Sequence, residues 1–238
     1  MILRIFLVLH FWSALTFATH AQRWYAGAQA GITLSVISGT GIASLTKPGV
    51  VAGGYVGHRF HPRFSAISGL NFIMKGAARN GNPAAGDFNT FSIHLNYLEM
   101  PWVFRWHIDA KHRFTIDAGL THSILLHQSV TQDGGQIQGD RGFNTYELGL
   151  LFGAAYRFHP NWALHLQFRN SISPIRPNIS GQTLVNPIWG QINIGQLNTV
   201  LSAGLSFQIW PSVKKERAET APPSNPKPQK PRGRIYDE

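Results

Sequence analysis

Hydrophobic and polar residues alternate with a period of two between residues 143 and 170. In the first half, apolar side chains occupy the even positions from Tyr146 to Phe158, with mainly small or charged residues between them. After His159-Pro160-Asn161 the alternation resumes and continues from Trp162 to Asn170. This period is typical of β-strands with one apolar and one polar face. The stretch therefore predicts two antiparallel strands joined by a tight turn.

The same alternation recurs along the chain and predicts eight strands, at residues 24–34, 49–60, 64–75, 91–106, 114–126, 143–158, 162–170 and 197–209. Short connections at His61, Asp109 and His159 alternate with longer loops, at 39–47, 77–90, 128–142 and 174–196. Outer-membrane barrels alternate short periplasmic turns with long external loops in this way. The sequence therefore predicts an all-β fold, an eight-stranded antiparallel up-and-down transmembrane β-barrel.

The predicted lipid-facing positions change phase within residues 91–106. Phe91, Ile93, Leu95 and Tyr97 fall at odd positions, whereas the later apolar residues, Met100, Trp102, Phe104 and Trp106, fall at even ones. A β-bulge near Tyr97-Leu98 would absorb the extra residue and accommodate Pro101, which has no N–H to donate. We therefore expect both sets to face lipid. In the last strand, we expect the lipid face to begin at Leu197 and Thr199.

Aromatic residues gather where the predicted strands meet the short turns. This set contains Trp24, Trp106, Phe114, Phe158, Trp162 and Trp210. Such a distribution is typical of an aromatic girdle at a membrane interface, so outer-membrane lipids are the expected surroundings. A soluble periplasmic barrel that binds lipid is the alternative, and it would need the apolar side chains inside.

The two ends of the chain differ in composition from the barrel region, 22–210. Residues 1–21 combine Arg4 with an apolar run and the small residues around Thr19-His20-Ala21, which predicts a signal peptide cleaved after Ala21. An anchor helix is the alternative, but the 14 residues of this run fall short of the roughly 20 that span a bilayer. Residues 211–238 interleave prolines with Lys and Arg, which predicts a disordered periplasmic tail.

The formal charge of +10 raises the question of nucleic-acid binding. One of these charges belongs to Arg4 and a net three belong to the tail, with seven Lys or Arg against four Asp or Glu, so the barrel region keeps +6. These remaining charges are scattered at turns, where lipid headgroups can act as counterions or water can solvate them. We therefore expect no nucleic-acid partner. The chain has no cysteine, which excludes both disulfides and an acylated N-terminal cysteine.

The polar faces of the predicted strands carry charges of both signs. The predicted inward set is Lys75, Glu99, Arg105, Asp117, Glu147, Arg157, His165 and Arg169. An eight-stranded barrel is just wide enough for side chains to fill, and unpaired charges there would be costly. We therefore expect a structural network of ion pairs that plugs the lumen. A narrow gated conduit is the alternative.

Catalytic, metal-binding and cofactor sites are not expected. His122-Ser123 lies near Asp117 and Glu147 in the predicted barrel, but adjacent residues of a strand point to opposite faces, and no G-x-S-x-G motif occurs. The eleven histidines form no H-E-x-x-H motif. The sequence therefore predicts a protein that is not an enzyme.

The barrel region resembles the outer-membrane β-barrel family typical of the Bacteroidota, which includes PorT-like proteins. Tyr97-Leu98-Glu99-Met100-Pro101 is similar to the Y-L-E-I-P signature of that family, and Lys75-Gly76 is similar to its K-G motif. The resemblance implies an integral protein of the outer membrane in which Glu99 and Pro101 have structural roles, and it transfers no catalytic residue. Family members often end at the last strand, whereas this chain continues for 28 residues beyond Trp210.

Together these features predict a non-enzymatic outer-membrane barrel whose external loops contact something outside the cell. The expected partners are lipids, the barrel-insertion machinery and an unknown periplasmic or external protein. An accessory role in secretion or envelope assembly is compatible with the PorT-like resemblance. A small porin is the main alternative.

Overall fold

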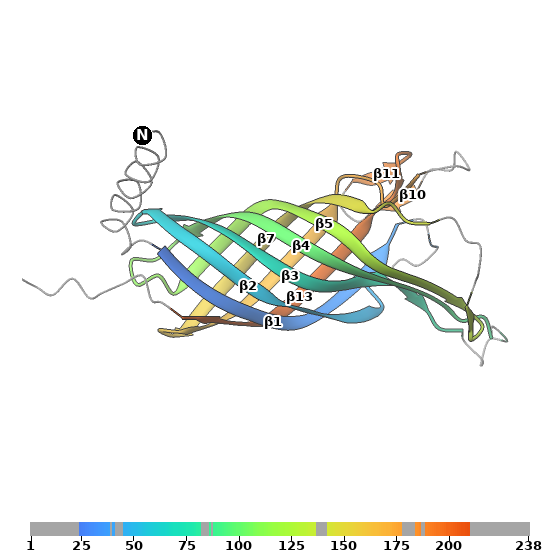
Figure 1. Cartoon of the computed structure of the whole chain (residues 1–238), viewed down its shortest axis with the longest axis horizontal. Coiled ribbons are helices and arrows are strands. Elements are labelled where there is room, and N and C mark those ends of the chain that lie inside the picture. Colours follow the sequence, from blue (N-terminus) through green and yellow to red (C-terminus); the bar gives the residue numbers. More distant parts are fainter. Residues whose placement is uncertain are drawn as a thin grey trace, which may run out of the picture.

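Eight long strands close into a barrel in the computed structural model, which describes residues 24–38, 40, 45–81, 86, 88–136, 142–177, 184–186 and 189–209. They are β1 (Trp24–Ile37), β2 (Lys47–His61), β3 (Phe64–Arg79), β4 (Phe91–His107), β5 (Phe114–Gln132), β7 (Tyr146–His159), β8 (Trp162–Ser171) and β13 (Asn198–Gln208). Each pairs antiparallel with its neighbours, and β1 pairs with β13 to close the barrel (Figure 1). The predicted fold is confirmed. The predicted signal peptide, Trp210 and the tail lie outside the described residues.

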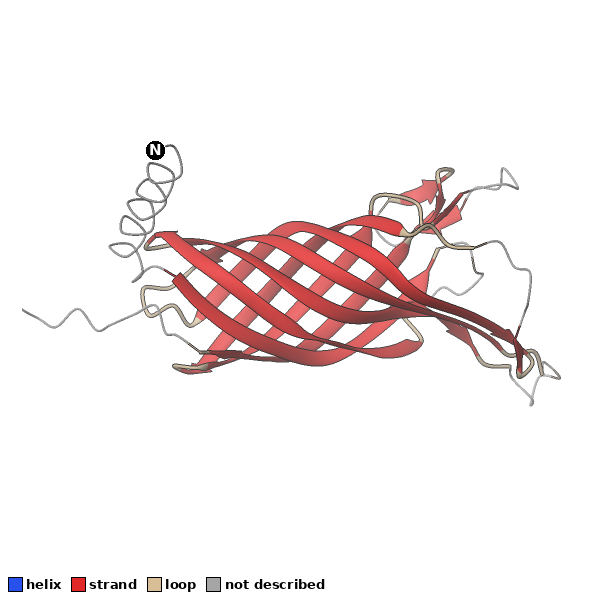
Figure 2. Ribbon diagram, in the orientation of Figure 1, coloured by secondary structure: helices blue, strands red, loops and turns tan. Residues whose placement is uncertain are grey.

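The two ends of the barrel differ in their connections. Trp24, at the start of β1, lies opposite His58, so β1 begins at the end that carries the three short turns. The opposite end carries the long loops with their short strands, β6 (Gly135–Gln136), β9 (Arg176–Pro177), β10 (Leu184–Asn186), β11 (Gly190–Ile192) and β12 (Gly195–Gln196) (Figure 2). At this end β3 and β5 continue beyond their predicted ends, to Arg79 and Gln132. The sequence did not predict the short loop strands.

Apolar side chains cover the outer surface of the barrel. Leu120, Leu164 and Leu166 are between 42% and 53% exposed, whereas their inward neighbours Thr121 and His165 are buried. The outward run from Phe114 to Leu126 extends about 30 Å along the membrane normal, at a rise of about 3.3 Å per residue and a tilt of about 40°. This matches the hydrocarbon thickness of a bilayer. The alternative of a soluble lipid-binding barrel is wrong, because it would place these side chains inside.

Among the described residues, no helix is long and apolar enough to cross a membrane.

Strand β4 corrects one prediction about the lipid face. Ile93, Leu95 and Tyr97 point into the lumen and are at most 1% exposed. The strand keeps odd residues inside and even residues outside along its length, so the predicted bulge near Tyr97-Leu98 does not exist. The loop end of the lumen is apolar, which is why hydrophobicity indicated the wrong face there. Near Pro101, two residue pairs are instead missing from the ladder between β3 and β4, in the interval from Ser68 to Asn71. The register is the same on both sides of this gap.

The irregularity lies on the neighbouring strand β5. Asn96 pairs with His127 and Tyr97 pairs with Leu125, so Leu126 is the extra residue of a β-bulge. Before the bulge Ser123 points inward, and after it the buried residue is Val130. Odd-numbered residues of β5 therefore point inward before the bulge and even-numbered residues point inward after it. The change occurs where the strand leaves the apolar outer band.

The last strand corrects a second prediction. Leu197 and Thr199 were predicted to face lipid, but both are at most 1% exposed. Asn170 donates hydrogen bonds to Thr199 Oγ1 at 2.7 Å and to Asn186 Oδ1 at 3.4 Å, so β10 lies over this part of the barrel wall. A loop strand, rather than lipid, covers the loop end of β13.

Candidate functional site

The lumen contains the eight side chains that were predicted to point into it. Seven of them form ion pairs or hydrogen bonds with other inward residues: Lys75, Glu99, Arg105, Asp117, Glu147, Arg157 and Arg169. The eighth, His165, is 3% exposed and has no hydrogen-bond partner on either ring nitrogen among the described residues. The structure places all eight side chains in the lumen and adds their partners, which the sequence did not supply.

Four of these residues form the central charge cluster, Lys75, Glu99, Glu147 and Arg169, from four different strands. Lys75 Nζ lies 2.8 Å from Glu147 Oε1 and 3.3 Å from Glu99 Oε2. Arg169 Nε lies 2.9 Å from Glu99 Oε1. The side chains are at most 3% exposed. Two bases and two acids thus neutralise each other across the lumen.

Neutral polar side chains complete the hydrogen bonding of the central charge cluster. Ser171 Oγ and Asn198 Nδ2 donate to the two carboxylate oxygens of Glu147, at 2.8 and 2.7 Å. Arg169 donates to Ser202 Oγ at 2.7 Å and to Gln167 Oε1 at 2.8 Å. Buried ion pairs are favourable when further hydrogen bonds satisfy them, so this network holds its geometry firmly.

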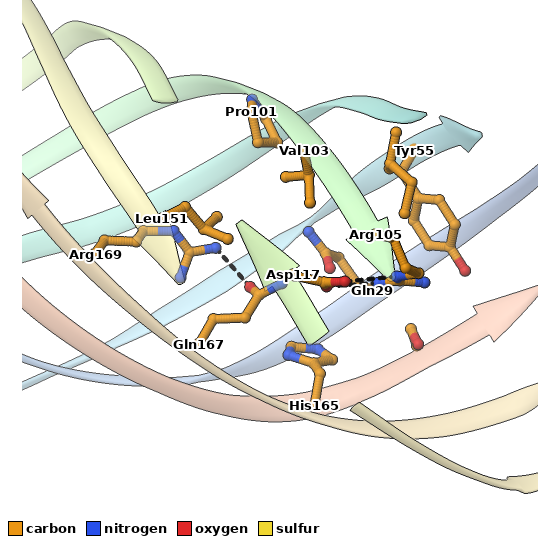
Figure 3. Close-up of a pocket in the computed structure, with 12 residues that line it drawn as sticks. Gln29, Tyr55, Pro101, Val103, Arg105, Asp117, Leu151, His165, Gln167 and Arg169 are labelled. Carbon is orange, nitrogen blue, oxygen red and sulfur yellow. Dashed lines mark hydrogen bonds and ion pairs between the residues drawn. The ribbon is translucent and has the colours of Figure 1, made fainter. Parts of the chain in front are cut away.

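A second pair lies closer to the short-turn end of the lumen. Arg105 donates two hydrogen bonds of 2.7 Å to the carboxylate of Asp117, in a bidentate arrangement. Beside it is a small cavity of about 30 Å³ with a mixed lining, to which His165, Gln167 and Gln29 contribute polar groups (Figure 3). This volume suits about one water molecule, which would give the ring of His165 a hydrogen-bond partner.

Apolar side chains fill the loop end of the lumen and form the apolar plug, made of Ile37, Val51, Ile73, Ala77, Ile93, Leu95, Tyr97, Val130, Phe143, Ile175 and Val200. Phe143 and Ile175 belong to loops that fold inward, although Phe143 was predicted to begin a strand. Lys75 Nζ lies 4.8 Å from the ring centre of Tyr97, which joins the plug to the central charge cluster. The lumen is therefore packed with charge in the middle and with hydrocarbon at the loop end.

The side chains of His122 and Ser123 do not meet. His122 lies on the outer face with its Nδ1 2.5 Å from Tyr146 Oη, and Ser123 Oγ points inward to Lys75 and Glu99. The two side chains point to opposite sides of β5, as their adjacency predicted. Within the described ranges, no group of three or more His, Asp or Glu side chains could hold a metal ion.

Comparison with known families decides the identity of this barrel. The family model described as "Outer membrane protein beta-barrel domain" matches residues 18–176. The chain belongs to this family. As a member of the outer membrane protein beta-barrel domain family it is an integral outer-membrane protein, and its apolar outer band contacts lipid. Among curated proteins, none matches the sequence.

Three solved outer-membrane proteins are similar to this chain at low sequence identity. Ail of Yersinia pestis is 10% identical, with 78% of this chain and 99% of Ail covered and a TM-score of 0.44. Neisserial surface protein A is 16% identical, with 77% and 96% covered and a TM-score of 0.43. OprG of Pseudomonas aeruginosa is 8% identical, with 78% and 95% covered and a TM-score of 0.39.

The motif that suggested a family resemblance is divided between the two faces of β4. Tyr97, Glu99 and Pro101 point inward, and Leu98 and Met100 point toward lipid. Glu99 is fully buried in the central charge cluster. The inward half of the motif therefore contributes to the packing of the lumen in this outer-membrane barrel.

The predicted aromatic girdle lies on the outer face at the short-turn end. Its described members, Trp24, Trp106, Phe114, Phe158 and Trp162, are between 40% and 56% exposed. Neighbouring rings touch, with centres 4.7 Å apart for Phe114 and Tyr156 and 4.9 Å apart for Trp162 and Phe207.

Several inward residues were missed by the sequence analysis. Tyr25 and Tyr55 lie in the lumen with their ring centres 6.4 Å apart, and Arg59 points into its short-turn end. Asn71 accepts a hydrogen bond from Gln29 at 2.9 Å. All of them occupy odd positions on β1, β2 or β3, so the same parity that identified the inward charges would have identified them.

Proposed function

We propose that this protein is a sealed, non-enzymatic outer-membrane barrel that acts through its external loops rather than by conducting solutes. The observation that carries the proposal is the central charge cluster. Its four side chains come from β3, β4, β7 and β8 and meet inside the lumen, with contacts of 2.8 to 3.3 Å. A water-filled path would have to separate them, and breaking a buried pair costs about 3–5 kcal/mol.

The apolar plug supports the same proposal. It lies beyond the central charge cluster, at the loop end, and includes Phe143 and Ile175 from the loops. A narrow solute channel is the second candidate, because the cavity beside His165 would form part of a hydrated path. The cavity is separated from the loop end by both the central charge cluster and the apolar plug, which favours a sealed barrel.

Conductance in planar lipid bilayers tests this proposal. The purified full chain, inserted from detergent, should give no steady current under an applied voltage. The matched control is the same preparation unfolded in urea before addition, which should behave identically. Reproducible single-channel steps from the folded protein alone would contradict the sealed barrel and favour the narrow channel.

We further propose that residues 1–21 direct export, that the barrel-insertion machinery places the mature chain in the membrane, and that the tail at 211–238 lies in the periplasm. The composition of both ends supports this assignment. Sequencing of the mature N-terminus should begin at Gln22, and an unprocessed chain in the outer membrane would contradict cleavage.

An accessory role in secretion or envelope assembly is a finer proposal, supported by the PorT-like motif at residues 97–101. A loop-mediated role predicts that the protein can be crosslinked to a partner through its external loops. Crosslinker introduced at Gln191, which is exposed on β11, should capture that partner, whereas crosslinker at Lys111 in a short turn should not. Equal capture from both positions would contradict a role of the loops.

A further inference from the structure

Two arginines enter the lumen at its short-turn end without an acidic partner. Arg59 projects from β2 and Arg157 from β7. Within the part of the chain that the structure describes, neither forms an ion pair with a carboxylate. Arg157 Nη2 donates to Gln208 Oε1 at 3.0 Å, whereas Arg59 Nε is buried without a hydrogen-bond partner. Both guanidinium groups therefore keep an uncompensated charge.

The other cations of the lumen differ in this respect. Lys75, Arg105 and Arg169 each have a carboxylate oxygen within 2.9 Å. Arg59 and Arg157 instead project from β2 and β7 into the same short-turn end of the lumen, where their charges and that of Arg105 repel one another. Enclosing like charges is unfavourable unless an opposite charge joins them. The short-turn end thus has an unbalanced positive charge of two arginines.

The surrounding side chains also have unused polar atoms. Tyr25 is 2% exposed and its hydroxyl has no hydrogen-bond partner among the described residues. His107 is 1% exposed, with Nε2 2.9 Å from Ser65 Oγ and Nδ1 without a described partner. The ring of His112 stands edge-on to it, with ring centres 4.9 Å apart. Together Tyr25, Arg59, His107, His112 and Arg157 form what we name the turn-end vestibule.

Two arginines, Arg59 and Arg157, face one carboxylate, Asp109, in the turn-end vestibule, so its charge balance is positive. Burial lowers the pKa of His112 and the nearby Arg59 and Arg157 lower it further, whereas Asp109 raises it by less. The carboxylate at this end of the barrel is Asp109, in the turn after β4. It accepts hydrogen bonds of 2.8 Å from the backbone N–H groups of Arg113 and Phe114, so it does not join the two arginines. The Arg105–Asp117 pair lies deeper in the lumen, where Tyr55 lines the same small cavity (Figure 3).

We propose that the turn-end vestibule is a binding site for an oxyanion, a phosphate or carboxylate group held between Arg59 and Arg157. Guanidinium groups bind such planar or tetrahedral oxyanions through paired N–H donors. The anion would supply the charge that the described residues lack, and the hydroxyl of Tyr25 offers a further donor. Because the Arg105–Asp117 pair and the central charge cluster lie behind it, the site is a dead end. Anion binding here is therefore independent of whether the protein conducts.

Calorimetric titration of the full chain in detergent micelles tests the site. Inorganic phosphate and acetate are titrated separately against a chloride background of equal ionic strength, which distinguishes a phosphate site from a carboxylate site. We expect saturable binding of at least one of the two anions. Arg59→Gln and Arg157→Gln should each weaken it about tenfold or more, the scale of one lost charge-assisted pair. Arg63→Gln, in the exposed turn after β2, is the matched control and should bind as the wild type does.

A second readout separates binding from folding. The arginine Nε resonances of the ¹⁵N-labelled wild type should shift for Arg59 and Arg157 on addition of the anion, while that of Arg63 should not. Heat-modifiable electrophoretic mobility should show that the variants remain folded barrels. The proposal is overturned if neither anion binds saturably, if Arg59→Gln and Arg157→Gln bind as the wild type does, or if Arg63→Gln loses as much affinity as they do.

Discussion

At the scale of single residues, the lumen is held by charges that have no access to water. Glu147 accepts hydrogen bonds from three side chains, Lys75, Ser171 and Asn198. Glu99 stands next to it and shares Lys75. Removing one member of such a cluster leaves its partners buried without compensation, which costs more than removing a whole pair.

Glu147→Ala should therefore lower the free energy of unfolding by about 3 kcal/mol, the typical cost of a broken buried pair. Urea unfolding in micelles, followed by tryptophan fluorescence, measures the change. The double variant Lys75→Met, Glu147→Leu should recover most of the loss, because it removes both charges and keeps the volume. A loss below about 0.5 kcal/mol in the single variant, the size of an ordinary surface substitution, would show that the cluster is not a structural element.

Glycines beneath the lumen tyrosines provide a second prediction at this scale. A Cβ atom at Gly27 would meet the ring of Tyr55 and the carbonyl oxygen of Phe207, whereas at Gly54, on the outer face of β2, the nearest atom is 3.6 Å away. Gly27→Ala should cost about 1–3 kcal/mol of unfolding free energy through overpacking. Gly54→Ala is the matched control and should be nearly neutral. Equal effects would contradict the inward placement of Tyr55.

At the scale of elements, the short turns define one end of the barrel and are held by local hydrogen bonds. In the turn between β4 and β5, Asp109 Oδ1 accepts from the backbone N–H groups of Arg113 and Phe114. Desolvation raises the pKa of Asp109, but these backbone donors outweigh it, so the pKa lies below its ordinary value. The charged form therefore stabilises the hairpin.

Asp109→Ala should destabilise the protein at neutral pH, with a penalty that disappears in acid. The unfolded-state pKa of an aspartate is about 3.9, so the contribution is fully present above about pH 5 and is lost as the pH falls through the lower folded-state value. Unfolding midpoints of wild type and variant at pH 7 and pH 2 measure it. A difference that stays constant between these pH values would contradict the role of the carboxylate.

The order of the strands, and the face to which each side chain points, could be predicted from the sequence wherever one face of a strand was polar. Residues 146–158 alternate cleanly, and their strand β7 has the predicted faces. Residues 91–97 were assigned to the wrong face because the apolar plug makes the inward side of β4 as hydrophobic as the lipid side. No alternation of apolar and polar residues marks the bulge at Leu126 or the short strands β9 to β12, so the sequence did not predict them. In the candidate site, the charged residues could be predicted from the sequence. Their pairing could not, because it joins strands that meet only across the lumen of the closed barrel.

At the scale of the whole molecule, the barrel has two chemically different ends. The short turns and the start of β1 lie at one end, and the long loops lie at the other. In the proposed orientation the loop end faces the outside of the cell, as in other outer-membrane barrels. Because the chain has no cysteine, single cysteines can report on this orientation without background.

Gly135→Cys and Gln191→Cys should react with a membrane-impermeant maleimide on intact cells, because both positions are exposed at the loop end. Lys111→Cys, in the exposed turn after β4, should react only after the outer membrane has been permeabilised. Labelling of Lys111→Cys in intact cells, with protection of the other two, would reverse the orientation.

The outer band of the barrel contacts hydrocarbon, while side chains pack the lumen. Nitroxide labels on Leu148→Cys, Leu164→Cys and Leu205→Cys, in protein reconstituted into lipid vesicles, test this arrangement by paramagnetic relaxation. All three labels should be accessible to oxygen, which dissolves in the bilayer, and inaccessible to a water-soluble nickel chelate. Labels that are accessible to nickel, or protected from both reagents as in a protein core, would contradict the account.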